Sequence, residues 1–272
     1  MDTGACRQLE ELVVSVARSP KYRGICPELV RGIGARELDA NDDLREATKQ
    51  TKTKLHQVIG IYRGTRPDYA AVLAALRRTG SPDETRAACF SGMRLHRSTK
   101  ERLPILTRFY QETLGGIESP RTVLDIACGL DPLAIPWMPL SPGATYLAFD
   151  ADADITAFVG DALPLMGVQG SATACDVTTS PPRQRADLAL VLKVLPCLEQ
   201  LRRGAGERLL DALDAEYLLV SFPTRGVSGR DRGMAEHYER SFLELASGRP
   251  WQVQRFEFPG ELAFLVRKGG RS

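Results

Sequence analysis

The residues best suited to chemistry lie at the end of one apolar run, in the segment Val-Leu-Asp-Ile-Ala-Cys-Gly-Leu-Asp-Pro at 123–132. The run Thr122–Ile126 is β-branched and aliphatic, and small residues and a glycine follow it, which predicts a buried parallel strand that turns sharply toward a ligand. Asp125 is expected to accept hydrogen bonds from a ligand's ammonium group, and Gly129 lets the backbone approach where a Cβ atom would clash. The segment is not a dinucleotide-binding fingerprint, because the later glycines of that pattern are absent.

Two more acids follow strand-like runs downstream. Asp150 ends the run 146–149, at the position where an acid in a doubly wound sheet meets ribose hydroxyls. Asp176 and Val177 follow the run 172–175 and offer a carboxylate and a backbone N–H that an adenine ring could use. Acids at three successive strand ends indicate one ligand site at the carboxyl edge of a sheet.

Further strand-like runs predict the rest of that sheet. The run 187–192 is almost continuously apolar, as expected for a strand buried on both faces. A fifth run covers 216–222, and the runs 252–258 and 262–267 are expected to form a closing antiparallel pair. We therefore predict an α/β fold with a Rossmann-like, mostly parallel seven-stranded sheet.

The front of the chain reads as helical. Apolar residues at helical spacing and helix-starting or helix-ending residues predict helices over 7–17, from Pro27 through Ile33, over 42–61 and over 69–78. Residues 98–114 are expected to link these helices to the sheet. The predicted division is an N-terminal all-helical domain at 1–112 and an α/β domain at 113–272.

Charge is distributed unevenly between the two halves. Residues 1–115 hold 20 Lys and Arg against 14 Asp and Glu, a balance of +6, whereas the remainder holds 16 against 20, a balance of −4. A basic front half on an acidic back half predicts a polyanion-binding appendage on a catalytic domain. Lys49, Lys52 and Lys54 are the proposed RNA-binding residues of the third helix; an ordinary solvated helix face is the alternative.

Composition excludes several classes of protein. Within the 272 residues no apolar run approaches the roughly 18 residues of a membrane span, and the polar N-terminus lacks the apolar centre of a signal peptide. The 6 cysteines show no Cys-x-x-Cys spacing and the 3 histidines are dispersed, which argues against a disulfide framework and a metal site. We expect a cytoplasmic protein with reduced thiols.

The segment at 123–132 resembles the first cofactor loop of S-adenosylmethionine-dependent methyltransferases. Together with three other segments, 96–103, 192–199 and 221–234, it looks like a more specific group. This is the family of aminoglycoside-resistance methyltransferases that modify nitrogen 7 of a guanine in the decoding site of 16S rRNA. The resemblance also includes 19–23 and 54–56, so it covers nearly the whole chain.

The resemblance implies a role for each matching residue. Arg102 matches the arginine that grips the cofactor carboxylate. The other residues implied in S-adenosylmethionine binding are Tyr62, His96, Arg97, Ser98, Asp125, Ala127, Gly129, Asp150, Asp176, Val177 and Leu192. Two positions depart from the family pattern, Asp131 where asparagine is common and Leu201 where some members have glutamine.

On the target side, the resemblance implies that Lys193 and Arg230 are catalytic and that Arg225 and Arg232 contact RNA. The implied partner is 16S rRNA in the 30S subunit, modified by a monomer without metal or membrane. Nitrogen 7 of guanine carries a free lone pair, so transfer needs alignment and exclusion of water rather than a general base. Lys193 and Arg230 would then hold phosphate or the guanine oxygen.

Three alternatives remain open at the level of sequence. Pro196-Cys197 is similar to the nucleophilic pair of RNA cytosine-5 methylases, in which a thiolate adds to the base. A small-molecule methyltransferase predicts a lidded apolar pocket and no use for a basic helical domain. A non-catalytic rRNA-binding assembly factor predicts a damaged cofactor pocket.

Overall fold

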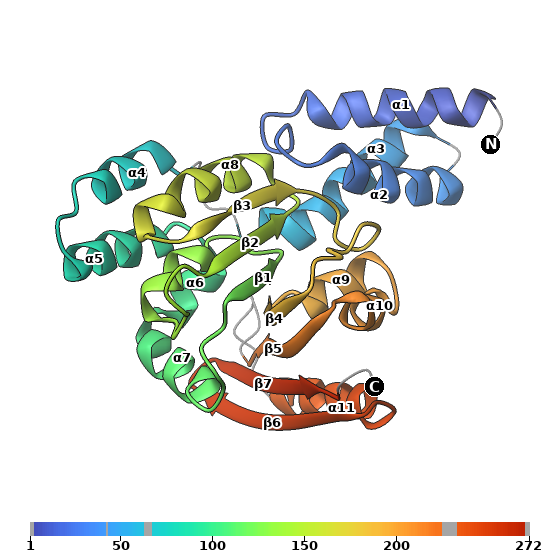
Figure 1. Cartoon of the computed structure of the whole chain (residues 1–272). Helices are drawn as coiled ribbons and strands as arrows, with labels where there is room; N and C mark the ends of the chain where they lie inside the picture. The colour runs from blue at the N-terminus through green and yellow to red at the C-terminus, as the bar shows by residue number, and fades with distance from the viewer. Residues whose placement is uncertain (1–2, 42, 63–66, 225–232, 270–272) are drawn as a thin grey trace.

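The computed structural model describes residues 3–41, 43–62, 67–224 and 233–269. Its centre is a seven-stranded sheet in the order β3-β2-β1-β4-β5-β7-β6 (Figure 1). The strands are β1 (Thr122–Ile126), β2 (Thr145–Asp150), β3 (Gln169–Ala174), β4 (Ala186–Leu192), β5 (Ala215–Pro223), β6 (Trp251–Phe258) and β7 (Glu261–Lys268). Only β7 runs antiparallel to its neighbours, β5 and β6. The predicted mostly parallel sheet with a closing antiparallel pair is confirmed.

Burial along the strands explains their sequences. β1 and β4 lie inside the sheet and are almost fully buried, so both are nearly continuous in apolar residues. β3 is an edge strand with small and polar side chains, most of them exposed. The carboxyl ends of the parallel strands β1, β2, β3 and β4 meet at one edge, where ligands of open α/β sheets bind.

The helices are α1 (Thr3–Ala17), α2 (Pro27–Ala40), α3 (Leu44–Leu55), α4 (Tyr69–Arg77), α5 (Pro82–Met93), α6 (Arg97–Arg102), α7 (Leu106–Leu114), α8 (Ala153–Ala162), α9 (Leu195–Leu201), α10 (Ala205–Ala212) and α11 (Met234–Ser247). Local chemistry sets several starts: the side chains of Asp43, Asp68 and Ser81 accept backbone N–H bonds in the first turns of α3, α4 and α5. Proline occupies the first turn of α2 and α5. Sequence analysis missed α5, although Ser81-Pro82-Asp83-Glu84 carries a helix-start pattern.

The third predicted helix changes character before its end. α3 stops at Leu55, and residues His56–Gly60 continue as a short π-helix, η1. The prediction of one helix over 42–61 therefore covers two kinds of helix. A π-helical turn moves side chains out of α-helical phase and is common at functional sites. Here it brings Val58 and Ile59 into the lining of a pocket at the carboxyl edge of the sheet.

Three hydrophobic cores hold the fold together. The first three helices enclose one of their own, around Leu12, Ile33 and Leu55. The two faces of the sheet carry the others, and one of these includes Leu76 of α4 and Phe109 of α7. Figure 1 accordingly shows α1, α2 and α3 set apart from the sheet, with α4 and α5 beside α8.

The packing therefore does not follow the predicted boundary between 1–112 and 113–272. α4, α5 and α7 are amphipathic, and their apolar faces bury against the sheet rather than against α1–α3. The part with a separate core consists of α1, α2, α3 and η1, and we call residues 3–62 the helical body. A truncation near residue 110 would remove α4, α5 and part of α7 from the core on one face of the sheet.

Candidate active site

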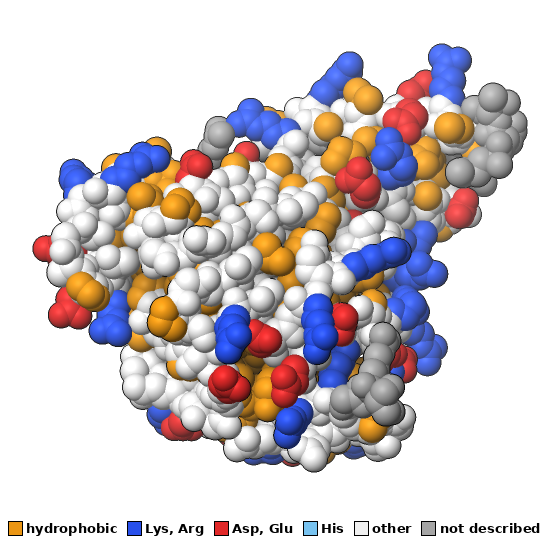
Figure 2. All heavy atoms as spheres, in the orientation of Figure 1, with side chains coloured by type: hydrophobic (Ala, Val, Ile, Leu, Met, Phe, Trp, Pro, Cys, Tyr) orange, Lys and Arg blue, Asp and Glu red, His pale blue; other side chains and the backbone are white. Residues whose placement is uncertain are grey.

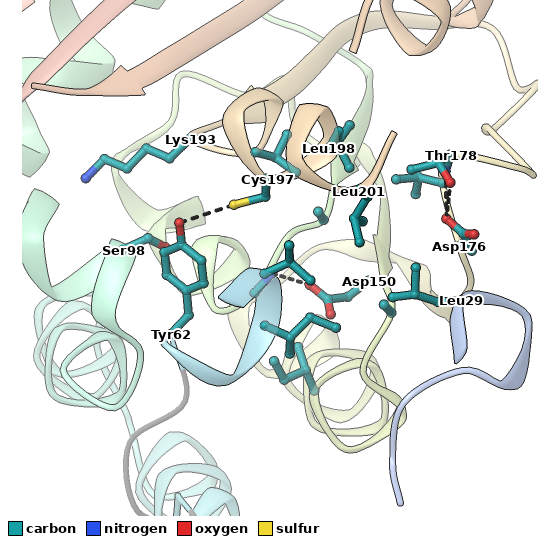
Figure 3. Close-up of a pocket in the computed structure, with 18 of the residues that line it drawn as sticks. Leu29, Tyr62, Ser98, Asp150, Asp176, Thr178, Lys193, Cys197, Leu198 and Leu201 are labelled. Carbon is teal, nitrogen blue, oxygen red and sulfur yellow. Dashed lines mark hydrogen bonds between the residues drawn. The ribbon is translucent and has the colours of Figure 1, made fainter. Parts of the chain in front are cut away.

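One pocket lies at the carboxyl edge of the parallel strands and is closed by the helical body (Figure 3). It brings together ten residues singled out from the sequence: Tyr62, His96, Ser98, Ala127, Gly129, Asp150, Asp176, Val177, Leu192 and Lys193. These residues come from segments that are more than a hundred positions apart in the chain. Three predicted residues, Arg97, Arg102 and Asp125, do not line the pocket.

Asp150 ends β2 with its carboxylate in the pocket and its side chain almost fully buried. Oδ2 accepts the backbone N–H of Gly129 at 2.9 Å, and Oδ1 accepts that of Asp152 at 2.9 Å. A carboxylate oxygen has a second lone pair to offer. The carboxylate is thus fixed in orientation at the wall of the pocket, where a carboxylate suits hydroxyl groups of a ligand.

The loop after β1 needs glycine for two reasons. Gly129 has φ +50, and a Cβ atom there would lie 2.8 Å from Cε1 of His96. The imidazole is held by Ser98, whose Oγ lies 3.1 Å from Nδ1, and it stacks on Tyr62 with 5.9 Å between ring centroids. The glycine loop therefore rests directly against an aromatic wall built by the N-terminal half of the chain.

The far end of the pocket suits a flat aromatic ring. Asp176 Oδ1 accepts bonds from the backbone N–H and the hydroxyl of Thr178, at 2.9 and 2.7 Å. Apolar side chains line the same pocket: Leu29 from α2, Val58 and Ile59 from η1, and Leu198 and Leu201 from α9. Sequence analysis did not assign Leu29, Val58 or Ile59 to the site, because apolar residues of helices read as core. It also missed Thr178, a turn residue that carries no local signal of a ligand site.

Arg102 does not reach the pocket. Its side chain is 0% exposed, and its guanidinium donates to Glu261 at 2.7–3.1 Å and to Asp131. The ring of Phe109 lies 4.9 Å from its central carbon. In place of the predicted pairing with a cofactor carboxylate, Arg102 joins α6, the loop after β1 and β7 through protein carboxylates.

Lys193 is also held by acids. Its Nζ lies 3.2 Å from Glu261 and 3.3 Å from Glu101, and the residue is 4% exposed. Part of the side chain lines the pocket, but Figure 3 shows its amine pointing away from Asp150 and Asp176. Lys193 also has φ +59, so the chain turns sharply as β4 ends.

Glu261 is a site residue that sequence analysis missed. Besides Arg102 and Lys193, it accepts the hydroxyl of Ser221 at 2.7 Å. Burial opposes ionisation of Glu261, but the two cations outweigh burial and hold its pKa below the ordinary value. One buried carboxylate therefore positions an arginine and a lysine behind the pocket.

Asp125 and Arg97 support the pocket from outside it. Asp125 is 1% exposed and accepts the hydroxyl of Tyr146 at 2.6 Å, so it lies behind the glycine loop rather than facing a ligand ammonium. Burial, followed by the charge of Asp131, raises the pKa of Asp125 well above its ordinary value. Arg97 pairs with Glu101 at 3.0 Å, and its backbone N–H donates to the carbonyl of Tyr62.

Cys197 lies on α9 at the rim of the pocket and faces Tyr62. Its Sγ is 3.3 Å from the phenol oxygen, and burial raises the pKa of the thiol. Since a thiol must ionise to attack a base, this environment disfavours the nucleophilic role considered from the sequence.

A basic groove lies on the outer face of the helical body. It is lined by Lys21, Arg45, Lys49 and Lys52, with Glu11 and Asp43 at its edges. Lys54 does not line it: two residues along an α-helix turn the side chain by about 200° from Lys52. Figure 2 shows Lys and Arg side chains, interspersed with Asp and Glu, over the part of the surface that the first helices form. Arg225, Arg230 and Arg232 lie outside the described residues.

Two negative findings concern the described ranges only. Within them, no three His, Cys, Asp or Glu side chains gather as metal ligands would. Over the same ranges, no helix is long and apolar enough to cross a membrane.

The fold and the pocket define a class of enzyme, the S-adenosylmethionine-dependent methyltransferases. The residues present fit the cofactor: Asp150 would offer acceptors of fixed orientation to a ribose, and Asp176 together with apolar side chains would face an adenine. Gly129 allows the loop after β1 to pack closely against His96. When bound, S-adenosylmethionine supplies an electrophilic methyl group on a sulfonium.

Comparison with known proteins narrows the class. The family model "Ribosomal RNA methyltransferase (FmrO)" matches residues 18–265. A protein of Frankia casuarinae named 16S rRNA (guanine(1405)-N(7))-methyltransferase is 42% identical, over 93% of this chain and 92% of its own length. One of the same name from Micromonospora echinospora is 36% identical, over 96% and 97%. The chain belongs to the FmrO family of ribosomal RNA methyltransferases.

Solved structures agree with this assignment. The crystal structure of the 16S rRNA methyltransferase RmtF in complex with S-adenosyl-L-homocysteine is 32% identical, with a TM-score of 0.83 over 99% of this chain and 100% of that one. The structure of the 16S rRNA methylase RmtB is 29% identical, with a TM-score of 0.79 over 96% and 98%. Both matches include the helical body as well as the sheet.

Proposed function

We propose that this enzyme transfers a methyl group from S-adenosylmethionine to nitrogen 7 of a guanine in the decoding site of 16S rRNA. It acts in the cytoplasm, as a monomer, on the assembled 30S subunit. The observation that carries the proposal is the match, over nearly the whole chain, to relatives named for this reaction. The product adds bulk and positive charge to an edge that gentamicin-type and kanamycin-type drugs approach with cationic amines, so resistance to them follows. Neomycin-type and apramycin-type drugs approach differently and remain active.

The arrangement of the pocket supports chemistry without a general base. Asp150 and Asp176 accept backbone N–H groups and a hydroxyl, and Cys197 lies beside Tyr62 with the pKa of its thiol raised by burial. An acceptor with a free lone pair requires only alignment and exclusion of water. The intact pocket favours an enzyme over a non-catalytic assembly factor, and the basic groove favours an RNA substrate over a small molecule.

Lys193 keeps its proposed place on the target side. Of its two acidic partners, Glu261 is 1% exposed at the side chain and Glu101 is 43% exposed. Glu101 is therefore the partner that a phosphate or a guanine oxygen would replace, while Glu261 continues to hold the amine in position. Arg230, which lies outside the described residues, remains a proposed second cation for the target nucleotide.

The test is transfer of a tritiated methyl group from labelled S-adenosylmethionine to purified 30S particles, followed by mapping of the modified base. Transfer to a small molecule with none to 30S would favour the small-molecule reading. Absence of any transfer, with the cofactor bound, would favour the assembly factor.

The basic groove is expected to bind phosphates of the rRNA. Binding to 30S should weaken steeply with salt, because each neutralised phosphate releases counterions. Replacing Lys49 and Lys52 by glutamine should lower the slope of log affinity against log salt by about 1.4–1.8. Lys54→Gln is the matched control and should leave the slope nearly unchanged. Equal effects of the two changes would show that the groove is not the docking surface.

Cys197→Ala is expected to retain methyl transfer to 30S within about threefold of the parent rate, because the protonated thiol takes no part in the chemistry. Initial rates of tritium transfer at saturating cofactor provide the measurement. Abolished transfer, in a folded variant that binds S-adenosylhomocysteine normally, would restore the nucleophilic reading.

A further inference from the structure

The segment that joins α1 to α2 crosses over to the sheet beside the cofactor pocket. Ile25 forms an isolated antiparallel bridge with Asp152. On either side of it, the N–H of Cys26 donates to the carbonyl of Ala151 and the N–H of Ala153 donates to the carbonyl of Gly24, both at 2.7 Å. The helical body is thus hydrogen-bonded, backbone to backbone, to Ala151 and Ala153, the two residues that flank Asp152.

These three residues set the orientation of the Asp150 carboxylate. Asp152, whose backbone pairs with Ile25, donates its own N–H to Oδ1 of Asp150 at 2.9 Å. Asp152 is 0% exposed, and Ala151 lines the pocket and packs against the core of the helical body. Moving the segment 24–26 would therefore move the backbone that fixes one oxygen of Asp150.

The segment 24–26 lies in close contact with residues 151–154. A Cβ atom on Gly24 would come within 3.3 Å of Asp152 Oδ1 and of the Asp154 carboxylate. Cys26 is 4% exposed in the core of the helical body and directly precedes α2, which carries Leu29 into the pocket one turn later. The backbone at Gly24 therefore lies so close to Asp152 and Asp154 that a larger side chain there would crowd them.

We propose that residues 24–26 are a positioning segment for the ribose of the cofactor. By holding Ala151–Ala153, they keep the Asp150 carboxylate aimed into the pocket and so set both the cofactor affinity and the preference for a ribose with free hydroxyls. The inference rests on the proposed role of Asp150 in holding that ribose. It gives the helical body a part in cofactor binding that is separate from its basic groove.

Cys26 allows a matched pair of variants in the full-length protein. Its φ of −55° suits proline, so Cys26→Pro keeps the local backbone conformation, removes the N–H, and places the ring against the carbonyl of Ala151. Cys26→Ala removes the same thiol and keeps the N–H. Calorimetry would compare the binding of S-adenosylhomocysteine with that of its analogue lacking the 2′- and 3′-hydroxyls.

Cys26→Pro should bind S-adenosylhomocysteine at least about fivefold more weakly than Cys26→Ala, with the loss confined to the ligand that has hydroxyls. The ratio of the two affinities should therefore shrink in Cys26→Pro and stay at the parent value in Cys26→Ala. Gly24→Val, which crowds Asp152 from the same side, should behave like Cys26→Pro, while Gly32→Val, where a Cβ meets nothing within 4 Å, should not.

A parallel loss for both ligands, or unchanged affinity in folded Cys26→Pro and Gly24→Val, would overturn the inference. The variant Asp150→Ala shows whether the positioning role of residues 24–26 or the assignment of the ribose site is wrong. If Asp150→Ala abolishes the hydroxyl preference and the segment variants do not, the segment has no positioning role. If Asp150→Ala also keeps the preference, the ribose site itself is misassigned.

Discussion

Asp150→Ala is expected to lower the affinity for S-adenosylhomocysteine about tenfold or more, because it removes two hydrogen bonds to a charged acceptor, each contributing about 1.5–3 kcal/mol as an upper range. The carboxylate is buried, and the N–H groups of Gly129 and Asp152 fix its orientation. Calorimetry on the folded variant provides the measurement.

Asp161→Ala is the control for Asp150, since it removes an exposed carboxylate from α8. It should leave the affinity unchanged. If Asp150→Ala bound the cofactor as tightly as the parent does, Asp150 would not belong to the cofactor site. The interpretation of the pocket as a nucleoside-binding pocket would then lack its main polar contact.

Arg102→Met is expected to lower the free energy of unfolding by about 3–5 kcal/mol, because it leaves buried carboxylates without their cation. Asp131 and Glu261 are both nearly inaccessible to water and bind the guanidinium directly. Urea unfolding, followed by circular dichroism, would measure the loss. Adding Glu261→Gln to Arg102→Met should recover part of it, because one uncompensated charge disappears while Lys193 still faces Glu101.

The same variant decides between two roles of Arg102. Family resemblance assigns it to the cofactor carboxylate, whereas the structure places it on Asp131 and Glu261. A variant that keeps its stability but loses cofactor affinity would show that the guanidinium leaves its protein partners when the ligand binds. A large loss of stability would support the structural role.

The local sequence pattern was sufficient to predict a pocket residue wherever that residue ends a strand. Asp150 and Asp176 follow recognisable apolar runs, and parallel strands bring their carboxyl ends to one edge without further information. Glu261 could not be found this way. It begins β7 and reaches Arg102 only because β7 pairs with β5, and the two residues are 159 positions apart. Nothing local distinguishes such an acid from one on the surface.

The helical half shows the same limit. The regular spacing of apolar residues predicted α1, α2 and α4. It did not show which apolar faces pack on the sheet, so the predicted boundary at 112 grouped α4 with α1 and α2 although α4 packs on the sheet. Spacing also grouped Lys54 with Lys49 and Lys52, although helix geometry turns Lys54 away from the groove. Leu29 reads as core in the sequence and becomes a pocket wall only when α2 docks beside Ala151.

The most direct test is the identity of the methylated base. Rounds of borohydride reduction and aniline cleavage break RNA at 7-methylguanine, so 16S rRNA from cells that express this protein should break at a single decoding-site guanine. The break should be absent with Asp150→Ala, and the same cells should resist gentamicin and kanamycin but not apramycin. Absence of the break in rRNA from cells that contain the folded protein would contradict the account. A break together with unchanged gentamicin sensitivity would also contradict it.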